Sequence, residues 1–168
     1  MSAVAEMTSL PIREAVEARD LAAVREAFAP DAVLRSPNTG SLKVEGREQI
    51  GALYKVILEV FADLEYIDEL RGENSALLMA RAHVDGVEIE IADHLRFDEN
   101  GKIRVLTVFF RPMPAMALAS RYLGAAIGRN QSPFRARLIS FLSAPMVAQT
   151  RTADRLANRL LGPGLRDT

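Results

Sequence analysis

Apolar residues in the first part of the chain recur at the spacing of one helix face. Ser9 is expected to cap a first short helix and Asp20 a second one, which extends to Phe28. The third pattern is longer, because apolar residues from Ile50 to Phe61 fall at i, i+3, i+4, i+7, i+8 and i+11. The sequence therefore predicts three helices, and the third buries one face along its length.

The pattern changes from helical spacing to strict alternation at Leu64 and keeps that alternation up to Phe110. Turn-forming residues interrupt it in three places, at residues 72–75, 85–86 and 98–101. This arrangement predicts an antiparallel meander of about four strands. A shorter strand is expected earlier, at Ala32–Arg35, ahead of a segment that is rich in proline and glycine.

One acidic residue lies on the apolar face of its predicted strand. Within residues 88–97, Asp93 alternates in phase with Ile91 and Leu95, whereas His94 belongs to the opposite face. A charged carboxylate on an apolar face is costly, so desolvation is expected to raise the pKa of Asp93 and to favour its protonated form.

The last predicted strand is apolar on both faces. Ile103, Val105, Thr107 and Phe109 form one face, and Leu106 and its neighbours at the same spacing form the other. Each apolar face of a strand needs a cover. We therefore expect a homodimer that forms through the sheet.

The C-terminal third returns to helical spacing, over residues 115–127, 133–142 and 146–161. These helices cannot form a separate core, so residues 1–112 are interpreted as one domain and residues 113–168 as a helical extension. The extension is expected to pack on the same domain or on a partner subunit. Met113 and Leu123 are expected either in the core or at the mouth of the domain.

The order of elements predicts an α+β fold, in which helices pack on the concave face of a curved antiparallel sheet. The 168 residues are 49% hydrophobic and 26% charged, which is typical of a globular domain. The chain has no cysteine, which excludes disulfides and thiolate metal sites, and it has only two histidines. Because no apolar run approaches the roughly 18 residues of a membrane span, we expect a cytoplasmic protein.

The net charge of −1 conceals an uneven distribution. Residues 1–103 hold 11 Lys and Arg against 20 Asp and Glu, whereas residues 104–168 hold 10 Arg against 2 Asp. The basic part is expected to dock on the acidic part of the same chain. Arg151, Arg155 and Arg159 form a stripe that is interpreted as a solvated helix face, with an anionic membrane or an acidic partner as alternatives. No aromatic-rich basic repeat indicates a nucleic-acid partner.

Three segments resemble a known family: ARDLAAVREAFAPDAVLRSP (Ala18–Pro37), EGREQIGALY (Glu45–Tyr54) and IADHLRFDENGKI (Ile91–Ile103). Together they are similar to the NTF2-like superfamily, which includes ketosteroid isomerases and SnoaL-type polyketide cyclases. The resemblance covers about residues 10–111 and implies a cone-shaped fold. It does not imply one reaction, because the superfamily holds isomerases, cyclases, dehydratases, hydrolases and noncatalytic proteins.

The resemblance also implies roles for particular residues. Asp93 falls where ketosteroid isomerases keep an aspartic acid of the oxyanion hole, and Tyr54 falls on a pocket tyrosine of that family. Two positions depart from the pattern, because Ile12 stands in place of the oxyanion-hole tyrosine and Ser36 in place of the general-base aspartate. A serine hydroxyl is too weak a base to remove a carbon-bound proton, so the isomerase reaction lacks an identified base.

The hypothesis that follows is a pocket for an apolar, carbonyl-bearing molecule such as a steroid, polyketide or terpenoid. Asp93 is the predicted general acid or oxyanion donor, and Tyr54 is its orienter or a second donor. The substrate-binding residues are predicted to be Ser36, Phe28, Leu53, Ile91, Leu95, Phe109 and Met113. Isomerisation, cyclisation or dehydration without a cofactor or metal would suit this site.

Blander interpretations stay open beside this hypothesis. Asp93 would also be accounted for as a buried carboxylate that backbone or hydroxyl groups satisfy, Tyr54 as a core residue and Ser36 as a turn residue. The alternative function is a noncatalytic ligand-binding or protein-interaction module, in which side chains fill the cone and the basic tail makes the contacts.

Overall fold

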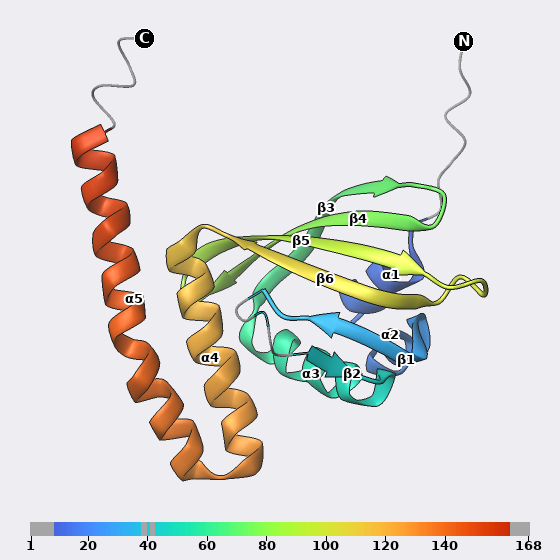
Figure 1. Cartoon of the computed structure of the whole chain (residues 1–168), viewed down its shortest axis with the longest axis horizontal. Helices are drawn as coiled ribbons and strands as arrows, with labels where there is room; N and C mark the ends of the chain where they lie inside the picture. The colour runs from blue at the N-terminus through green and yellow to red at the C-terminus, as the bar shows by residue number, and fades with distance from the viewer. Residues whose placement is uncertain (1–8, 38–39, 41–42, 162–168) are drawn as a thin grey trace.

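The computed structural model describes residues 9–37, 40 and 43–161 (Figure 1). Its helices are α1 (Pro11–Glu17), α2 (Leu21–Ala27), α3 (Arg47–Val60), α4 (Met113–Gln131) and α5 (Pro133–Leu161). Its strands are β1 (Phe28–Arg35), β2 (Lys43–Glu45), β3 (Ala62–Arg71), β4 (Ser75–Val84), β5 (Val87–Phe97) and β6 (Ile103–Arg111). The predicted α+β class and the four-strand meander are confirmed.

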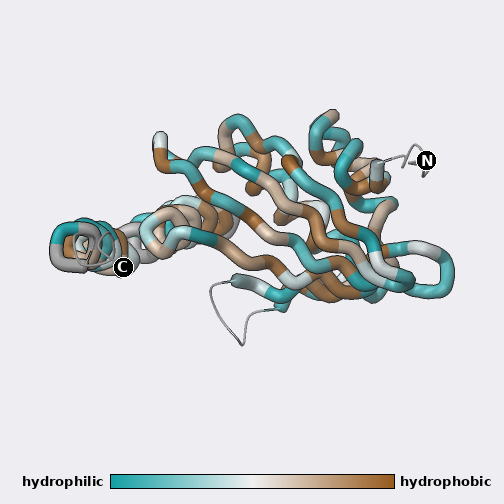
Figure 2. Tube along the Cα trace, turned by 90° about the horizontal axis from the view of Figure 1, so that it is seen from above, coloured by the Kyte–Doolittle hydropathy of each residue, from teal (hydrophilic) through white to brown (hydrophobic). Residues whose placement is uncertain are grey.

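The strands form one curved sheet in the order β2-β1-β6-β5-β4-β3 (Figure 1). Strands β3 to β6 pair with antiparallel neighbours, as the alternation predicts. One pairing departs from an all-antiparallel sheet, because β1 runs parallel to β6. Figure 2 shows hydrophilic and hydrophobic segments alternating along the strands, as expected where one face of a sheet lies in the core.

The hydrophobic core lies between the inner face of the sheet and the helices α1, α2 and α3. Phe28 of β1, Ile50 of α3 and Phe61 at the end of α3 are almost completely buried there. Burial of a large apolar side chain contributes about 1.5–3 kcal/mol, so this layer fixes the helices against the strands.

The ends of the first two helices show which local predictions hold. Asp20 caps α2 as expected, since its carboxylate accepts two backbone N–H bonds from the first turn of that helix. The prediction that Ser9 caps α1 is wrong: the N-cap position is Leu10, and the Ser9 hydroxyl donates to Glu14 instead. Phe28 begins β1 rather than ending α2.

Strand β6 does not keep the single alternation that the sequence suggests. Arg96 of β5 pairs with Val105, but the next residue, Phe97, pairs with Ile103, so β6 holds one extra residue at this point. The extra residue inverts the faces of the strand that follow it. Phe109, expected on the ligand side, is therefore 57% exposed on the outer side.

The C-terminal third forms two helices rather than the predicted three, because α5 continues through Pro145. Helix α4 packs against α3 and the end of the sheet, and α5 packs along α4 (Figures 1 and 2). The basic part, residues 104–168, makes two ion pairs with the acidic part, Arg104 with Asp31 and Arg111 with Glu90, whereas no described arginine of α5 makes one. No described helix has both the length and the hydropathy that crossing a membrane requires.

Replacement of Leu118 by Ala tests whether α4 folds as part of the main core. Leu118 is 1% exposed, so Leu118→Ala is expected to lower the free energy of unfolding by about 2–5 kcal/mol. Leu156→Ala on α5, where the side chain is 49% exposed, is the matched control and should change that value by less than about 0.5 kcal/mol. Urea unfolding followed by circular dichroism measures both. Equal small effects would place α4 outside the core.

Candidate functional site

Asp93 is the only charged residue of the described chain whose side chain is buried, with 7% exposure. It lies on β5 between the cross-strand neighbours Leu78 of β4 and Val108 of β6. All three side chains point to the inner face of the sheet, toward α3. The strand alternation therefore places Asp93 on the apolar side, where the sequence predicts it.

The Asp93 carboxyl faces a small cavity of about 40 Å³ that also touches two tyrosines. Tyr54 comes from α3, one turn beyond Ile50, and is 5% exposed. Tyr66 comes from β3 and is 6% exposed. It stands opposite Ala80 of β4, whose small side chain leaves room beside the ring. A cavity of this size holds about one water-sized group.

Burial without a compensating cation sets the electrostatics of this cavity. Desolvation raises the pKa of Asp93 from 3.8 to about 7, and no described residue offers its carboxyl a hydrogen bond or an ion pair. Burial also raises the pKa of both Tyr54 and Tyr66 well above the ordinary value, and the nearby Asp93 charge adds to this effect. The cavity therefore presents two phenol hydroxyls and, below neutral pH, a protonated carboxyl.

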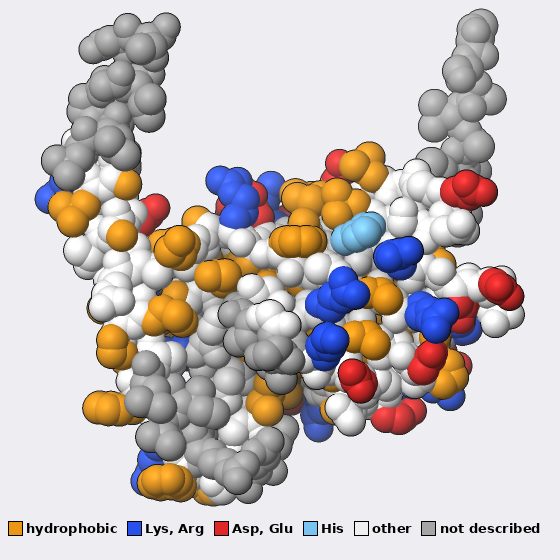
Figure 3. All heavy atoms as spheres, in the orientation of Figure 1, with side chains coloured by type: hydrophobic (Ala, Val, Ile, Leu, Met, Phe, Trp, Pro, Cys, Tyr) orange, Lys and Arg blue, Asp and Glu red, His pale blue; other side chains and the backbone are white. Residues whose placement is uncertain are grey.

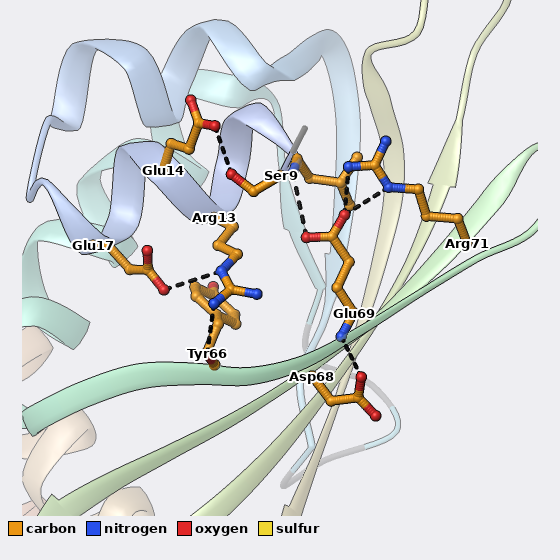
Figure 4. Close-up of polar contacts among 9 residues, drawn as sticks. Ser9, Arg13, Glu14, Glu17, Tyr66, Asp68, Glu69 and Arg71 are labelled. Carbon is orange, nitrogen blue, oxygen red and sulfur yellow. Dashed lines mark hydrogen bonds and ion pairs between the residues drawn. The ribbon is translucent and has the colours of Figure 1, made fainter. Parts of the chain in front are cut away.

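Helix α1 holds the strand that carries Tyr66 (Figure 4). The Arg13 guanidinium donates a hydrogen bond of 2.9 Å to the backbone oxygen of Tyr66 and a second one of 3.1 Å to Glu17. Farther along β3, Glu69 accepts a hydrogen bond from the backbone of Leu10 and pairs with Arg71. These contacts fix the position of β3 from outside the cavity.

A second cavity of about 290 Å³ adjoins the first. The two share the lining residues Leu34, Ile57, Val108 and Phe110. The larger cavity is apolar except for the hydroxyls of Ser36 and Ser120. An apolar cavity therefore lies next to the small one that Asp93, Tyr54 and Tyr66 line.

The structure brings together five of the predicted site residues. Tyr54, Asp93 and Ile91 line the smaller cavity, and Ser36 and Leu53 line the larger one.

The structure places the other four predicted site residues outside these cavities. Phe28 is fully buried with its ring centre 5.9 Å from that of Tyr54, so it supports Tyr54 without lining a cavity. Leu95 is 1% exposed in the core. Phe109 and Met113 do not line the site, because they are 57% and 62% exposed. The extra residue in β6 explains Phe109, and Met113 lies exposed at the start of α4.

Sequence reasoning missed Tyr66 and Phe110. The apolar residues Leu64 and Tyr66 alternate with Glu65, which is a signal for an inward Tyr66, but a register shift directly after Tyr66 breaks that pattern. The extra residue in β6 turns Phe110 inward and Phe109 outward, so an uninterrupted alternation gives the wrong face for both.

The two cavities contain one carboxylate, Asp93, among their described lining residues. His94 is exposed on the opposite face of β5, so it supplies no base to this site. No group of three or more His, Asp or Glu residues in the described chain is arranged to hold a metal ion. A further cavity of about 360 Å³ lies between α1, α2 and the turn after β5, but it contains no buried charged side chain.

Comparison with known proteins agrees with this geometry. A family model described as a SnoaL-like domain matches residues 12–106, more than half of the chain. The chain belongs to the SnoaL-like family, within the NTF2-like superfamily. No curated protein sequence matches it.

Solved structures resemble this SnoaL-like protein over most of its length. A steroid delta-isomerase from Pseudomonas aeruginosa is 31% identical, with a TM-score of 0.60, and the match covers 78% of this chain and 88% of that one. A protein of cystatin-like fold from Silicibacter pomeroyi is 18% identical, with a TM-score of 0.68 and coverage of 77% and 91%. A candidate polyketide cyclase from Sinorhizobium meliloti is 20% identical, with a TM-score of 0.50 and coverage of 58% and 88%. The last two comparisons concern the fold alone.

The raised pKa of Asp93 predicts a stability that depends on pH. The folded protein keeps this proton up to about pH 7, whereas the unfolded chain releases it near 3.8, so the free energy of unfolding falls as pH rises between these values. Asp93→Asn removes the titration. The variant is expected to be more stable than the wild type at pH 8 by up to about 4 kcal/mol and to differ little at pH 4.

Urea unfolding at the two pH values measures this difference. Glu73→Gln, the same acid-to-amide change at an exposed position, is the control and should show no such dependence. An Asp93→Asn variant that is equally stable relative to the wild type at pH 4 and pH 8 would contradict the prediction.

Proposed function

We propose that this SnoaL-like protein binds a small apolar carbonyl compound and promotes its enolisation, as a step of isomerisation, cyclisation or dehydration. One observation carries the proposal: an unpaired, buried Asp93 carboxyl stands with Tyr54 and Tyr66 at the inner end of an apolar cavity. The likeness to a protein described as a steroid delta-isomerase supports the same class of chemistry.

The arrangement suits a carbonyl oxygen that gains negative charge. In its protonated form Asp93 donates a hydrogen bond to that oxygen, and the phenols of Tyr54 and Tyr66 are further donors. Because the cavity is mostly apolar and the three side chains are buried, these donors face less competition from water than exposed groups do. Ketosteroid isomerases use the same principle, because an apolar site keeps an aspartic acid of their oxyanion hole protonated.

The proton that leaves carbon needs an acceptor. Ser36 lies in the larger cavity, but its hydroxyl is too weak a base for this role. We propose that water or a basic group of the substrate takes the proton, while Asp93 and the tyrosines stabilise the oxygen. This arrangement favours substrates that enolise easily, such as β-dicarbonyl compounds and ketones with benzylic α-protons, over simple aliphatic ketones.

The missing base also favours a second candidate function. A protein with donors for a carbonyl and no base would bind a carbonyl compound without converting it. Both functions require the same bound carbonyl compound, so binding does not distinguish them. A measurement of turnover does.

Exchange of the α-protons of 2-tetralone for deuterium in D2O, followed by NMR, tests the catalytic proposal. The wild type is expected to accelerate exchange over buffer, and Asp93→Leu is expected to lose about 100-fold of that acceleration, as for other oxyanion donors. Tyr54→Phe and Tyr66→Phe should give smaller losses. His94→Gln, on the opposite face of β5, is the control and should exchange at the wild-type rate.

Binding of 2-tetralone without acceleration would leave the binding function in place of catalysis. Neither binding nor acceleration would reject both candidate functions for this class of ligand.

We also propose that the outer face of the sheet joins two copies of the chain. Met79, Ala92 and Phe109 are cross-strand neighbours on the face opposite Asp93, and Phe109 is 57% exposed. Figure 3 shows hydrophobic side chains on the visible face of the strands, together with basic side chains and a histidine. The ion pair between Arg111 and Glu90 lies beside this patch and gives its edge both signs of charge, which a two-fold contact can use for complementary pairing.

Sedimentation at micromolar concentration tests this assembly. The wild type is expected to be a dimer and Phe109→Asp a monomer, because a charge in the centre of an apolar interface is left unpaired. Phe141→Asp, at a position of α5 that is 76% exposed, should remain dimeric. A monomeric wild type, or a dimer that survives Phe109→Asp, would exclude the proposed interface.

A further inference from the structure

Helix α4 forms one wall of the larger cavity. Its lining residues are Ser120, Leu123, Gly124 and Ile127. They fall at i, i+3, i+4 and i+7, which is a single helix face. The opposite walls come from β1, β2, β6 and α3. The apolar part of the cavity is therefore a space between the SnoaL-like fold and a helix that follows it.

This wall lies outside the segment that defines the family. The SnoaL-like match ends at residue 106, and α4 begins at Met113. The α4 side of the larger cavity thus lies outside the family match, whereas Asp93, Tyr54 and Tyr66 lie within it, as do the lining residues of β1, β2 and α3.

The wall is fixed in place by packing on both sides of the lining face. Ala117, Leu118 and Ala119 of α4 are buried with at most 1% exposure. The Ser120 hydroxyl donates to the Met116 carbonyl at 2.7 Å, so it is not available as a donor to a ligand. Helix α4 therefore presents a firm surface without a hydrogen-bond donor.

The volume of the cavities limits what this wall admits. The cavities measure about 290 and 40 Å³, which together stand near the lower end of the range for drug-sized ligands. The smaller one takes little more than a carbonyl oxygen. We infer that α4 sets the size of the ligand and restricts it to a compact carbonyl compound of one or two rings. This inference rests on the proposed function, because that function supplies the carbonyl.

Two molecules with the same two-ring skeleton separate the contributions of α4 and Asp93. Tetralin has no carbonyl, so its binding reports the apolar cavity alone, and 2-tetralone adds the carbonyl. Gly124→Leu places a side chain on the lining face and favours the helix, so it fills the cavity without a helix-propensity cost. Leu123→Ala enlarges the cavity. Arg129→Leu, at an exposed position of α4, is the control.

Dissociation constants by NMR titration give the expected result. Gly124→Leu should weaken the binding of tetralin and of 2-tetralone alike, by about tenfold or more. Arg129→Leu should leave both dissociation constants within about twofold of the wild-type values. Leu123→Ala should bind a three-ring ketone about tenfold more tightly than the wild type, which binds such a ketone poorly. Asp93→Leu should remove only the preference for 2-tetralone over tetralin.

Different failures point to different parts of the account. If folded Gly124→Leu and Leu123→Ala proteins bind every probe as the wild type does, α4 does not set the ligand size. If tetralin and 2-tetralone bind equally in the wild type and Asp93→Leu changes neither, the proposed function fails while the wall stands. A wild type that binds neither molecule overturns both.

Discussion

Burial of one carboxyl group that has no ion-pair partner among the described residues is the constraint on which this account depends. Ionised Asp93 would lose its hydration and gain no partner, so the protein keeps the proton on it up to about neutral pH. The alternation of β5 turns the side chain inward, and α3 and β3 close the space around it with Tyr54 and Tyr66. A buried acid that weakens the fold at high pH is typical of a position kept for function rather than for stability.

Three surfaces of the molecule enter the proposals. The inner face of the sheet supplies Asp93 and Tyr66, α4 supplies an apolar wall of the larger cavity, and the outer face around Phe109 is the proposed dimer contact. Family membership accounts for the first surface, since the SnoaL-like match spans the strands and helices that surround Asp93. It does not specify the ligand of the proposed function, because the α4 side of the larger cavity comes after the matched segment.

Much of this arrangement follows from local patterns in the sequence. The spacing from Ile50 to Phe61 predicts α3 and the inward Tyr54, and the alternation of β5 predicts the inward Asp93, because both patterns are uninterrupted. The faces of β6 were not predictable in the same way, since a single extra residue inverts them and leaves no mark in the composition. The wall formed by α4 depends on contacts between residues far apart in the chain, which periodicity does not report.

The most direct test of the central claim is the titration of the Asp93 carboxyl itself. In protein labelled with carbon-13 at aspartate side chains, the signal of Asp93 can be assigned through its loss in Asp93→Asn and followed by NMR from pH 3 to pH 9. The account predicts a midpoint of about 7. A midpoint near the ordinary value of about 3.9 would show a solvated or paired carboxylate and would contradict it.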